Sequence, residues 1–272
     1  MRIGIIKLGA IATALLIDYM LDERADREDI DVRTITSGSK LRERDAEIVD
    51  KMREFNPDLV IVASPNAALP AAKLARDALK AEGKPVIVIS DAPAKKVKDE
   101  LEAEGFGYIL VNADSMIGAR REFLDPTEMC LYNSDVIKVL AATGAFRAVQ
   151  LAVDEAIESA KAGKPKLPRL IIDAEAAVNA GNFSNPYARA KAMAAYTIAE
   201  KVAAVTTKAC FVEKDAEKYI PMVAAAHEMM RYAAKLAEEA REIEKSSDAV
   251  YRTPHAKDGR VLSKWGLMEK PS

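Results

Sequence analysis

The sequence predicts an α/β fold of the Rossmann-like kind, in which a parallel β-sheet carries helices on both faces. Two observations predict this fold. Short aliphatic runs alternate with amphipathic stretches through the first 111 residues, and the aliphatic runs are nearly continuous rather than interrupted by polar residues. Strands buried on both faces have this composition, and they occur in parallel sheets covered by helices. We therefore expect right-handed crossovers between the strands.

The expected strands are the short apolar runs, and a helix is expected after each of the first four. The strands are Ile3–Ile6, Val32–Thr36, Leu59–Ala63, Pro85–Ile89 and Tyr108–Val111. The helices are Ile11–Leu21, Arg44–Phe55, Ala68–Lys80 and Lys95–Glu104. Residues 1–125 are thus expected to form one α/β cofactor-binding domain.

Residues 126–245 are expected to be a helical segment that contains a small β insert. Asp125 and Pro126 are the residue types that begin a helix, as N-cap and first-turn residue. Arg169–Ile172 reads as a strand that Ala209–Val212 could pair with in a small accessory sheet. Long helices are expected at Tyr187–Ala203 and Ala216–Lys245, followed by an irregular C-terminal tail at 246–272.

Composition excludes several classes of function. A formal net charge of -2 gives no broad basic surface, so nucleic acid is not an expected partner. Cys130 and Cys210 fit no metal-binding spacing, and we expect reduced thiols and no metal. No signal peptide is recognisable, and no apolar run approaches the roughly 18 residues of a membrane span. A cytoplasmic protein without membrane contact is expected.

Three loops follow expected strands and precede expected helices, at residues 7–13, 64–66 and 90–96. Ligands of open parallel sheets bind at such loops, and helix N-termini there favour anions. The loops are either ordinary turns or the binding site of a cofactor with phosphate and carboxylate groups, and the three together favour the cofactor. A nicotinamide cofactor is poorly supported, because Ala12 stands where the dinucleotide fingerprint needs a second glycine.

The arginine pair Arg120 and Arg121 is a second candidate site. Two adjacent guanidinium groups can clamp a carboxylate or phosphate, or they can form an ion-pair network with the acidic residues of 122–128.

The two histidines are the remaining candidates. His227 and Glu228 do not form a zinc HExxH motif, because Arg231 occupies the position of the second histidine. We interpret His227 as a buried polar or substrate-contacting residue. His255 either covers a pocket or lies in an exposed loop.

Seven segments resemble those of the coenzyme F420-dependent methylenetetrahydromethanopterin dehydrogenases of methanogenic archaea, and the likeness covers nearly the whole chain. They are residues 21–27, 107–111, Met116–Pro126, Asn133–Ala141, Asn185–Ala188, Ala226–Met230 and Arg252–His255. The resemblance implies reversible hydride transfer from the methylene carbon of the reduced pterin to the deazaflavin ring of coenzyme F420. It also implies a homo-oligomer, a hexamer built as a trimer of dimers.

The resemblance and the loop positions together suggest residues for each ligand. Contacts to coenzyme F420 are expected from Lys7, Gly9, Ala10, Thr13, Ser64, Pro65, Asn66, Asp91, Ala92, Pro93 and Lys95. Contacts to methylene-tetrahydromethanopterin are expected from Arg120, Arg121, Asn185, Tyr187, Lys191, His227 and His255. Direct hydride transfer needs no metal, acid or nucleophile from the protein, but its methenyl product is cationic. Asp91 or Glu228 could therefore act in catalysis by stabilising that charge.

The loops depart from the family pattern by carrying alanine where glycine or asparagine is usual, including Ala10, Ala12 and Ala94. A methyl group at a position with positive φ would strain the backbone, whereas one at a permissive position stabilises the fold. The leading hypothesis is an active dehydrogenase. The alternative is a non-catalytic family member that retains the fold and the oligomer but has impaired cofactor binding.

Overall fold

A single parallel sheet forms the centre of the protein. The computed structural model describes residues 1–116 and 120–272, so residues 117–119 of the family-like segment Met116–Pro126 lie outside the described part. The sheet has six strands in the order β2-β1-β3-β4-β5-β6, all parallel. The strands are β1 (Arg2–Lys7), β2 (Asp31–Thr36), β3 (Leu59–Ser64), β4 (Val86–Asp91), β5 (Gly107–Val111) and β6 (Arg169–Ile172). The predicted parallel α/β fold is confirmed.

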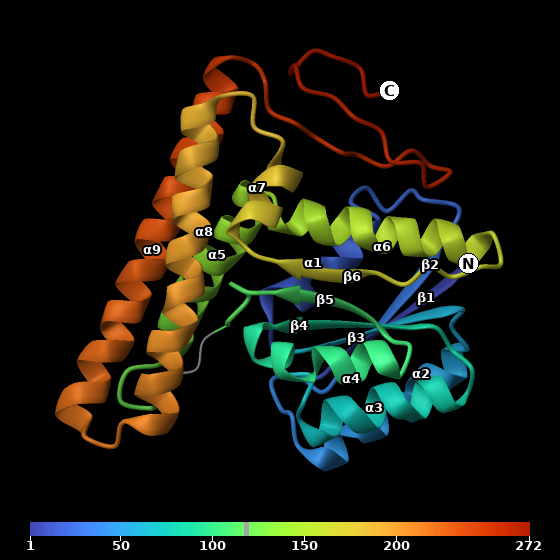
Figure 1. Ribbon diagram of the computed structural model, residues 1–272, viewed down its shortest axis with the longest axis horizontal. Coiled ribbons are helices and arrows are strands. Elements are labelled where there is room, and N and C mark those ends of the chain that lie inside the picture. The colour runs from blue at the N-terminus through green and yellow to red at the C-terminus, as the bar shows by residue number, and fades with distance from the viewer. Residues whose placement is uncertain (117–119) are drawn as a thin grey trace.

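Helices cover both faces of this sheet (Figure 1). Helices α1 (Ala12–Leu21) and α6 (Ala145–Lys161) cover one face, and α2 (Ile48–Phe55), α3 (Pro70–Ala81) and α4 (Lys98–Ala103) cover the other. Short 3-10 segments, η1 (Glu43–Glu47) and η2 (Ala92–Val97), precede α2 and α4. The inner strands alternate between two hydrophobic clusters, as the two-residue period of a strand requires. Ile61, Ile89 and Ile109 face α1 and α6, whereas their neighbours Val60, Val88 and Leu110 face α2–α4.

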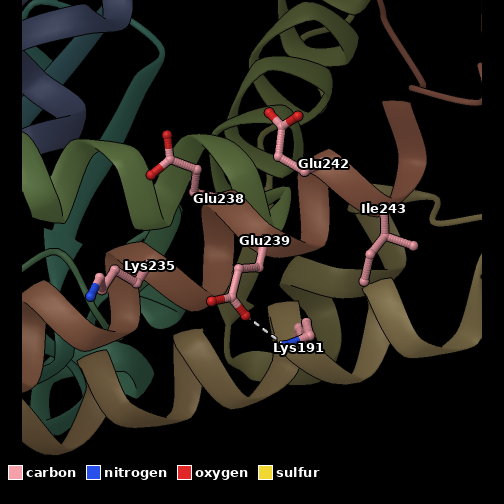
Figure 2. Close-up of a pocket in the computed structure, with 6 residues that line it drawn as sticks. All are labelled: Lys191, Lys235, Glu238, Glu239, Glu242 and Ile243. Carbon is pink, nitrogen blue, oxygen red and sulfur yellow. Dashed lines mark hydrogen bonds and ion pairs between the residues drawn. The ribbon is translucent and has the colours of Figure 1, made fainter. Parts of the chain in front are cut away.

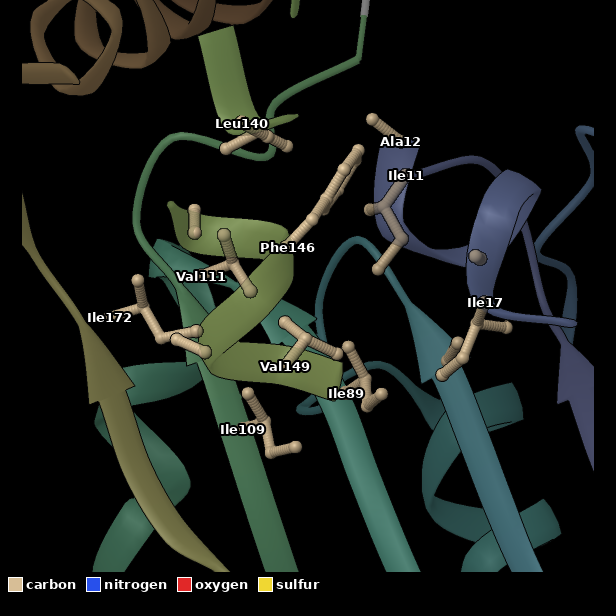
Figure 3. Packing of buried hydrophobic residues seen from close by; sticks show 14 of the residues in the cluster. Ile11, Ala12, Ile17, Ile89, Ile109, Val111, Leu140, Phe146, Val149 and Ile172 are labelled. Atoms are coloured by element: carbon tan, nitrogen blue, oxygen red, sulfur yellow. The ribbon is translucent and has the colours of Figure 1, made fainter. Parts of the chain in front are cut away.

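The larger cluster lies between the sheet and the helices α1, α5 and α6. Figure 3 shows Phe146 and Val149 of α6 in one cluster with Ile89, Ile109 and Val111 of the inner strands. All five side chains are buried. Near-complete burial of aliphatic surface on both sides of the strands is the main favourable term for this fold, at roughly 25 cal/mol per Å².

Two expectations for the second half of the chain are wrong. The strand β6 does not belong to a separate insert, because it pairs with β5 and extends the main sheet. Ala209–Val212 is not a strand, because Lys208–Val212 forms a π-helical turn, η3, that continues α8. The edge of β5 needs a hydrogen-bonding partner, and the chain returns from α6 through 162–168 directly beside it. The short helix α7 (Ala174–Gly181) was also not expected.

A layer of helices stands beyond the carboxyl ends of the strands (Figure 1). It consists of α5 (Pro126–Thr143), α8 (Pro186–Thr207) and α9 (Ala216–Ser246), and α8 and α9 pack along much of their length. Tyr196 and Glu200 of α8 attach the layer to the sheet, through hydrogen bonds to Ile172 O at 2.7 Å and to Asn112 Nδ2 at 3.1 Å. We call this layer the helical wall.

No single helix among the described residues is long and apolar enough to cross a membrane. Helices α5 and α6 reach that length and composition only as a pair, across a bend of 67°.

The C-terminal tail folds back over α6 and is held there by a buried histidine (Figure 1). The two ring nitrogens of His255 lie 2.8 Å from carboxylate oxygens of Glu23 and Asp154. Arg27 shares this cluster, with its guanidinium 3.2 Å from Asp154 and 2.8 Å from Asp29. Both imidazole nitrogens can donate to carboxylates only when the ring is protonated.

The tail anchor should weaken as the pH rises. Burial acts to lower the pKa of His255, but the hydrogen bonds to Asp154 and Glu23 outweigh it, so the pKa is raised above 6.5. The stabilisation is therefore complete below 6.5 and is lost as the pH rises through the higher folded-state pKa. We expect hydrogen exchange of residues 250–261 to accelerate over that window. In a His255→Gln variant the pH-dependent component should vanish; protection that is independent of pH in the wild type would contradict this account.

Candidate functional site

The strand order reverses direction at the carboxyl edge of the sheet, between β1 and β3. The chain leaves β1 for α1 on one face and leaves β3 for α3 on the other, so the two loops diverge there. Ligands of doubly wound sheets bind at such a reversal point. Gly9 and Pro65 face each other across it: a Cβ added to Gly9 would lie 3.1 Å from Pro65 Cδ. Gly9 also has a φ of +75°, a conformation that glycine adopts without strain.

The second and third loops are fixed by short polar contacts between β3 and β4. Ser90 donates its hydroxyl to Ser64 O at 2.7 Å and accepts the N–H of Ala67 at 3.0 Å. The Asn66 side chain accepts the N–H of Ala68 at 3.0 Å. These contacts hold Ser64, Pro65 and Asn66 beside the ends of β1 and β4.

The N-terminus of α1 is not free to bind an anion, contrary to expectation. The Asp114 carboxylate accepts the N–H of Ala12 at 2.6 Å and that of Thr13 at 3.2 Å. An acidic side chain therefore already caps the helix and balances its N-terminal partial charge. Of the lysines expected near the loops, Lys7 is half-buried, which lowers its pKa, and Lys95 is exposed.

Asp91 is the buried acid at the end of β4. Burial, together with the neighbouring Asp114 charge, raises its pKa to about 8, although the N–H groups of Ala92 and Asp114 oppose the rise. Its Oδ1 atom has no hydrogen-bond partner in the described part of the chain. A largely neutral carboxyl group thus stands at the centre of the edge at neutral pH.

One aromatic side chain of the helical wall, Tyr132, lies near this acid. Tyr132 of α5 is buried, and burial together with the charge of Asp91 raises its pKa. The His227 ring packs between Tyr132 and Phe123, at centroid distances of 4.6 and 4.7 Å. Burial lowers the pKa of His227 even though Glu128 lies 3.4 Å from its Nδ1 atom, so the ring is neutral at neutral pH.

Unpartnered polar atoms gather at this edge. A buried polar atom without a hydrogen bond is costly, and native proteins keep few of them. Among the described residues these atoms are Thr13 Oγ1, Ser64 Oγ, Asp91 Oδ1 and Asn112 Oδ1 at the carboxyl edge, His227 Nε2 on the helical wall, and Arg76 Nε in α3. Because most of them lie at the carboxyl edge, this edge is the candidate ligand-binding site.

The alanines in the loops do not distort the backbone. Positive φ among non-glycine residues of the described chain occurs at Ala25, Asn56, Asn182 and Asp248, and at none of the loop alanines. The methyl groups of Ala12, Ala67 and Ala94 are fully buried and belong to the hydrophobic clusters. Figure 3 shows Ala12 next to Ile11 in the larger cluster. These methyl groups pack into the protein interior and do not point between the loops that follow β1 and β3.

The other candidate residues lie at several places. The Arg120 guanidinium donates to Ala209 O and Glu213 O and stacks on Tyr219 at 4.2 Å, so it is occupied within the wall. Arg121 is exposed. Glu228 is also exposed and pairs with Arg231 at 3.7 Å, although it directly follows His227.

Asn185, Tyr187 and Lys191 are not at the carboxyl edge. Asn185 caps the N-terminus of α8, about 22 Å along the helix axis from Glu200, and Tyr187 is 78% exposed. Lys191 pairs with Glu239 at 2.6 Å in a hollow between α8 and α9, as Figure 2 shows. His255 lies beyond the other end of α1, about 15 Å along that helix from Thr13.

Three residues of the edge were not anticipated from the sequence: Asn112, Asp114 and Tyr132. Asn112 and Asp114 follow β5 as Asp91 ends β4, so the loop after β5 could have been included among the candidate loops on the same grounds. Tyr132 is one of several residues on the apolar face of a helix, and nothing in its sequence context distinguished it as a site residue.

No group of three possible metal-ligating side chains occurs within residues 1–116 and 120–272.

Gly9→Ala should destabilise the protein, because alanine at this φ costs roughly 1–2 kcal/mol and its methyl group meets Pro65. Ala10→Gly is the matched control, and it should cost only roughly 0.4–1 kcal/mol through the unfolded state. Urea denaturation of both variants checks the difference. Equal stability of the two variants would show that the packing of the β1 loop against Pro65 does not require glycine at position 9.

Comparison with known proteins gives consistent results across the full length. A family model described as methylene-5,6,7,8-tetrahydromethanopterin dehydrogenase matches residues 1–272. An Archaeoglobus fulgidus protein described as F420-dependent methylenetetrahydromethanopterin dehydrogenase is 68% identical over 271 residues, or 99% of this chain and 98% of that protein. A Methanocaldococcus jannaschii protein with the same description is 56% identical over 273 residues, with 99% of each chain covered.

A solved structure agrees with these relatives. It contains F420 dependent methylene-tetrahydromethanopterin dehydrogenase in complex with methylene-tetrahydromethanopterin and coenzyme F420. The present chain matches it with a TM-score of 0.96 at 52% identity, over 100% of this chain and 99% of that one. The resemblance inferred from the sequence segments is therefore confirmed, and the chain belongs to the methylene-5,6,7,8-tetrahydromethanopterin dehydrogenase family.

Proposed function

We propose that this protein catalyses reversible hydride transfer between methylene-tetrahydromethanopterin and coenzyme F420 at the carboxyl edge of the sheet. The observation that carries the location is the convergence of unpartnered buried polar atoms there. Family membership supports the reaction, and the chain is an oxidoreductase on that ground. Coenzyme F420 supplies the deazaflavin ring that exchanges the hydride, and the residues at the edge suit such a ligand.

The residues proposed to hold the cofactor are those of the three loops. The Ser64 hydroxyl and Asp91 Oδ1 offer unpartnered polar atoms, and half-buried Lys7 offers positive charge toward acidic groups. The other proposed contacts are Gly9, Ala10, Thr13, Pro65, Asn66, Ala92, Pro93 and Lys95. Gly9 has no Cβ atom, so a ligand can approach its backbone closely.

The helical wall is proposed to hold the pterin side of the reaction. Tyr132 lies near Asp91, the His227 ring packs on Tyr132 and keeps an unpartnered Nε2 atom, and Arg120 and Arg121 lie on the segment that leads to α5. Such walls align two rings and exclude water, so that proximity and orientation supply most of the rate. Asn185, Tyr187, Lys191, Glu228 and His255 are not brought to this site by the fold and have no proposed role in it.

Asp91 is proposed to stabilise the positive charge of the methenyl product. A cation beside a buried carboxyl group favours its ionised form and lowers its pKa. The acid therefore interacts more strongly with the product-like transition state than with the neutral substrate, which is the requirement for catalysis.

The non-catalytic alternative is not favoured. Its physical basis was strain or obstruction by the loop alanines, but none of them has a positive φ, and the methyl groups of Ala12, Ala67 and Ala94 face inward. The full-length identity of 68% to a protein described as the enzyme argues in the same direction.

We further propose a cytoplasmic homo-oligomer, a hexamer assembled as a trimer of dimers. Large apolar side chains exposed on the helical wall support this, among them Leu131, Tyr187 and Tyr232. Sedimentation velocity should give six times the mass of the chain. A monomer at micromolar concentration would contradict the proposal.

Asp91→Asn should lower kcat for methylene oxidation roughly tenfold to hundredfold, because no carboxylate then stabilises the positive charge that develops in the transition state. In the wild type, kcat/KM should rise with pH with a midpoint of about 8, as Asp91 ionises in the free enzyme. The variant should lack this limb.

The measurement is F420 reduction followed optically across pH, with Asp258→Asn as a control. Asp258 is an exposed acid of the tail, and its loss should change neither rate nor profile. An unchanged rate and pH profile in Asp91→Asn would remove Asp91 from the mechanism.

A further inference from the structure

The buried carboxylate of Asp114 joins two parts of the chain that are distant in sequence. It follows β5 by three residues, and its side chain is fully buried. Oδ1 accepts the N–H of Ala12 at 2.6 Å, and Oδ2 accepts the N–H of Thr13 at 3.2 Å. These are the first two residues of α1, about 100 positions earlier in the sequence.

This contact passes across the proposed reaction site. Strands β3 and β4 lie between β1 and β5 in the sheet, so β1 and β5 are about 14 Å apart at the usual strand spacing. Asp114 therefore ties the start of α1 to the far side of the ends of β3 and β4. The loop that contains Gly9 leads directly into α1, and its position depends on where α1 begins.

Asp114 also acts on Asp91. Its backbone N–H faces the Asp91 carboxylate, and its negative charge disfavours ionisation of that acid. Burial also raises the pKa of Asp114, and hydrogen bonds from Thr13 and Ala12 at the start of α1 oppose that rise. The other titratable groups around the pair are Lys95 of η2, Tyr132 of α5 and Tyr196 of α8.

We propose that Asp114 is a positioning residue for hydride transfer, which holds the start of α1, the Gly9 loop and Asp91 in one fixed arrangement. This inference rests on the proposed function and assigns a role to a residue outside the expected contacts. Because small displacements of reacting groups cost large factors in rate, its loss should slow the chemical step more than it weakens binding.

Two variants separate the hydrogen bonds of Asp114 from its charge. Asp114→Ala removes both, whereas Asp114→Asn keeps an oxygen that can accept the N–H of Ala12. The matched control is Asp173→Ala, because Asp173 is an exposed carboxylate that caps α7 by accepting the N–H of Ala176 at 2.9 Å. It removes a helix cap of the same kind with no connection to α1 or Asp91.

We expect Asp114→Ala to lower kcat at least about tenfold while the Kd for oxidised coenzyme F420 changes less than about threefold. The deuterium isotope effect on kcat, measured with substrate labelled at the methylene carbon, should increase. Asp114→Asn should recover part of the rate, and the midpoint of its kcat/KM profile should move to lower pH because the charge beside Asp91 is gone. Asp173→Ala should change none of these quantities.

Hydrogen exchange provides a readout that needs no activity. Amides 12 and 13 should exchange faster in Asp114→Ala than in the wild type and in Asp173→Ala. Wild-type kcat, isotope effect and pH midpoint in Asp114→Asn would overturn the proposal, as would unchanged exchange at these amides in Asp114→Ala. If Asp114→Ala does not fold, Asp114→Asn decides. A wild type that does not reduce coenzyme F420 would instead refute the proposed function, and the exchange result would still test the attachment of α1.

Discussion

The structure depends on one constraint: its inner strands are buried on both faces, so they carry no polar side chains along most of their length. Polar groups can appear only where the strands end, and parallel strands all end at the same edge. The carboxyl edge consequently gathers Ser64, Asp91 and Asn112 within one small region. The helical wall places the buried Tyr132 ring beside this region, and the ring of His227 packs on Tyr132.

Burial has a second consequence at this edge, which concerns charge. Two carboxyl groups, Asp91 and Asp114, lie close together away from water, and the environment cannot hold both as anions cheaply. The N–H groups at the start of α1 favour ionisation of Asp114, and the Asp114 charge in turn contributes to the raised pKa of Asp91. An acid that is neutral in the empty site and ionises beside a cation suits a reaction whose product carries a new positive charge.

Sequence patterns predicted the sheet well because each inner strand is a local aliphatic run. They predicted the strand Arg169–Ile172 but not its pairing with β5, because which segment returns beside β5 is a long-range property. They were wrong for Ala209–Val212, which is helical. For the proposed site, the positions at strand ends pointed to Asp91 and the three loops. The same logic, applied to the loop after β5, would have found Asp114. Tyr132 could not have been found, because only the packing of α5 against the strand ends makes it part of the site. His255 was expected among the substrate contacts because of the segment in which it lies, but in the structure its ring contacts Asp154 and holds the tail.

The central claim is that the carboxyl edge of this chain binds coenzyme F420 and brings it to the methylene pterin. Titration of the purified protein with oxidised coenzyme F420, followed by its fluorescence, tests this most directly. The account predicts saturable binding by the wild type, and bleaching of the cofactor fluorescence when methylene-tetrahydromethanopterin is added. A well-folded protein that shows no saturable binding would contradict it, because the unpartnered polar atoms at the edge would then have another purpose.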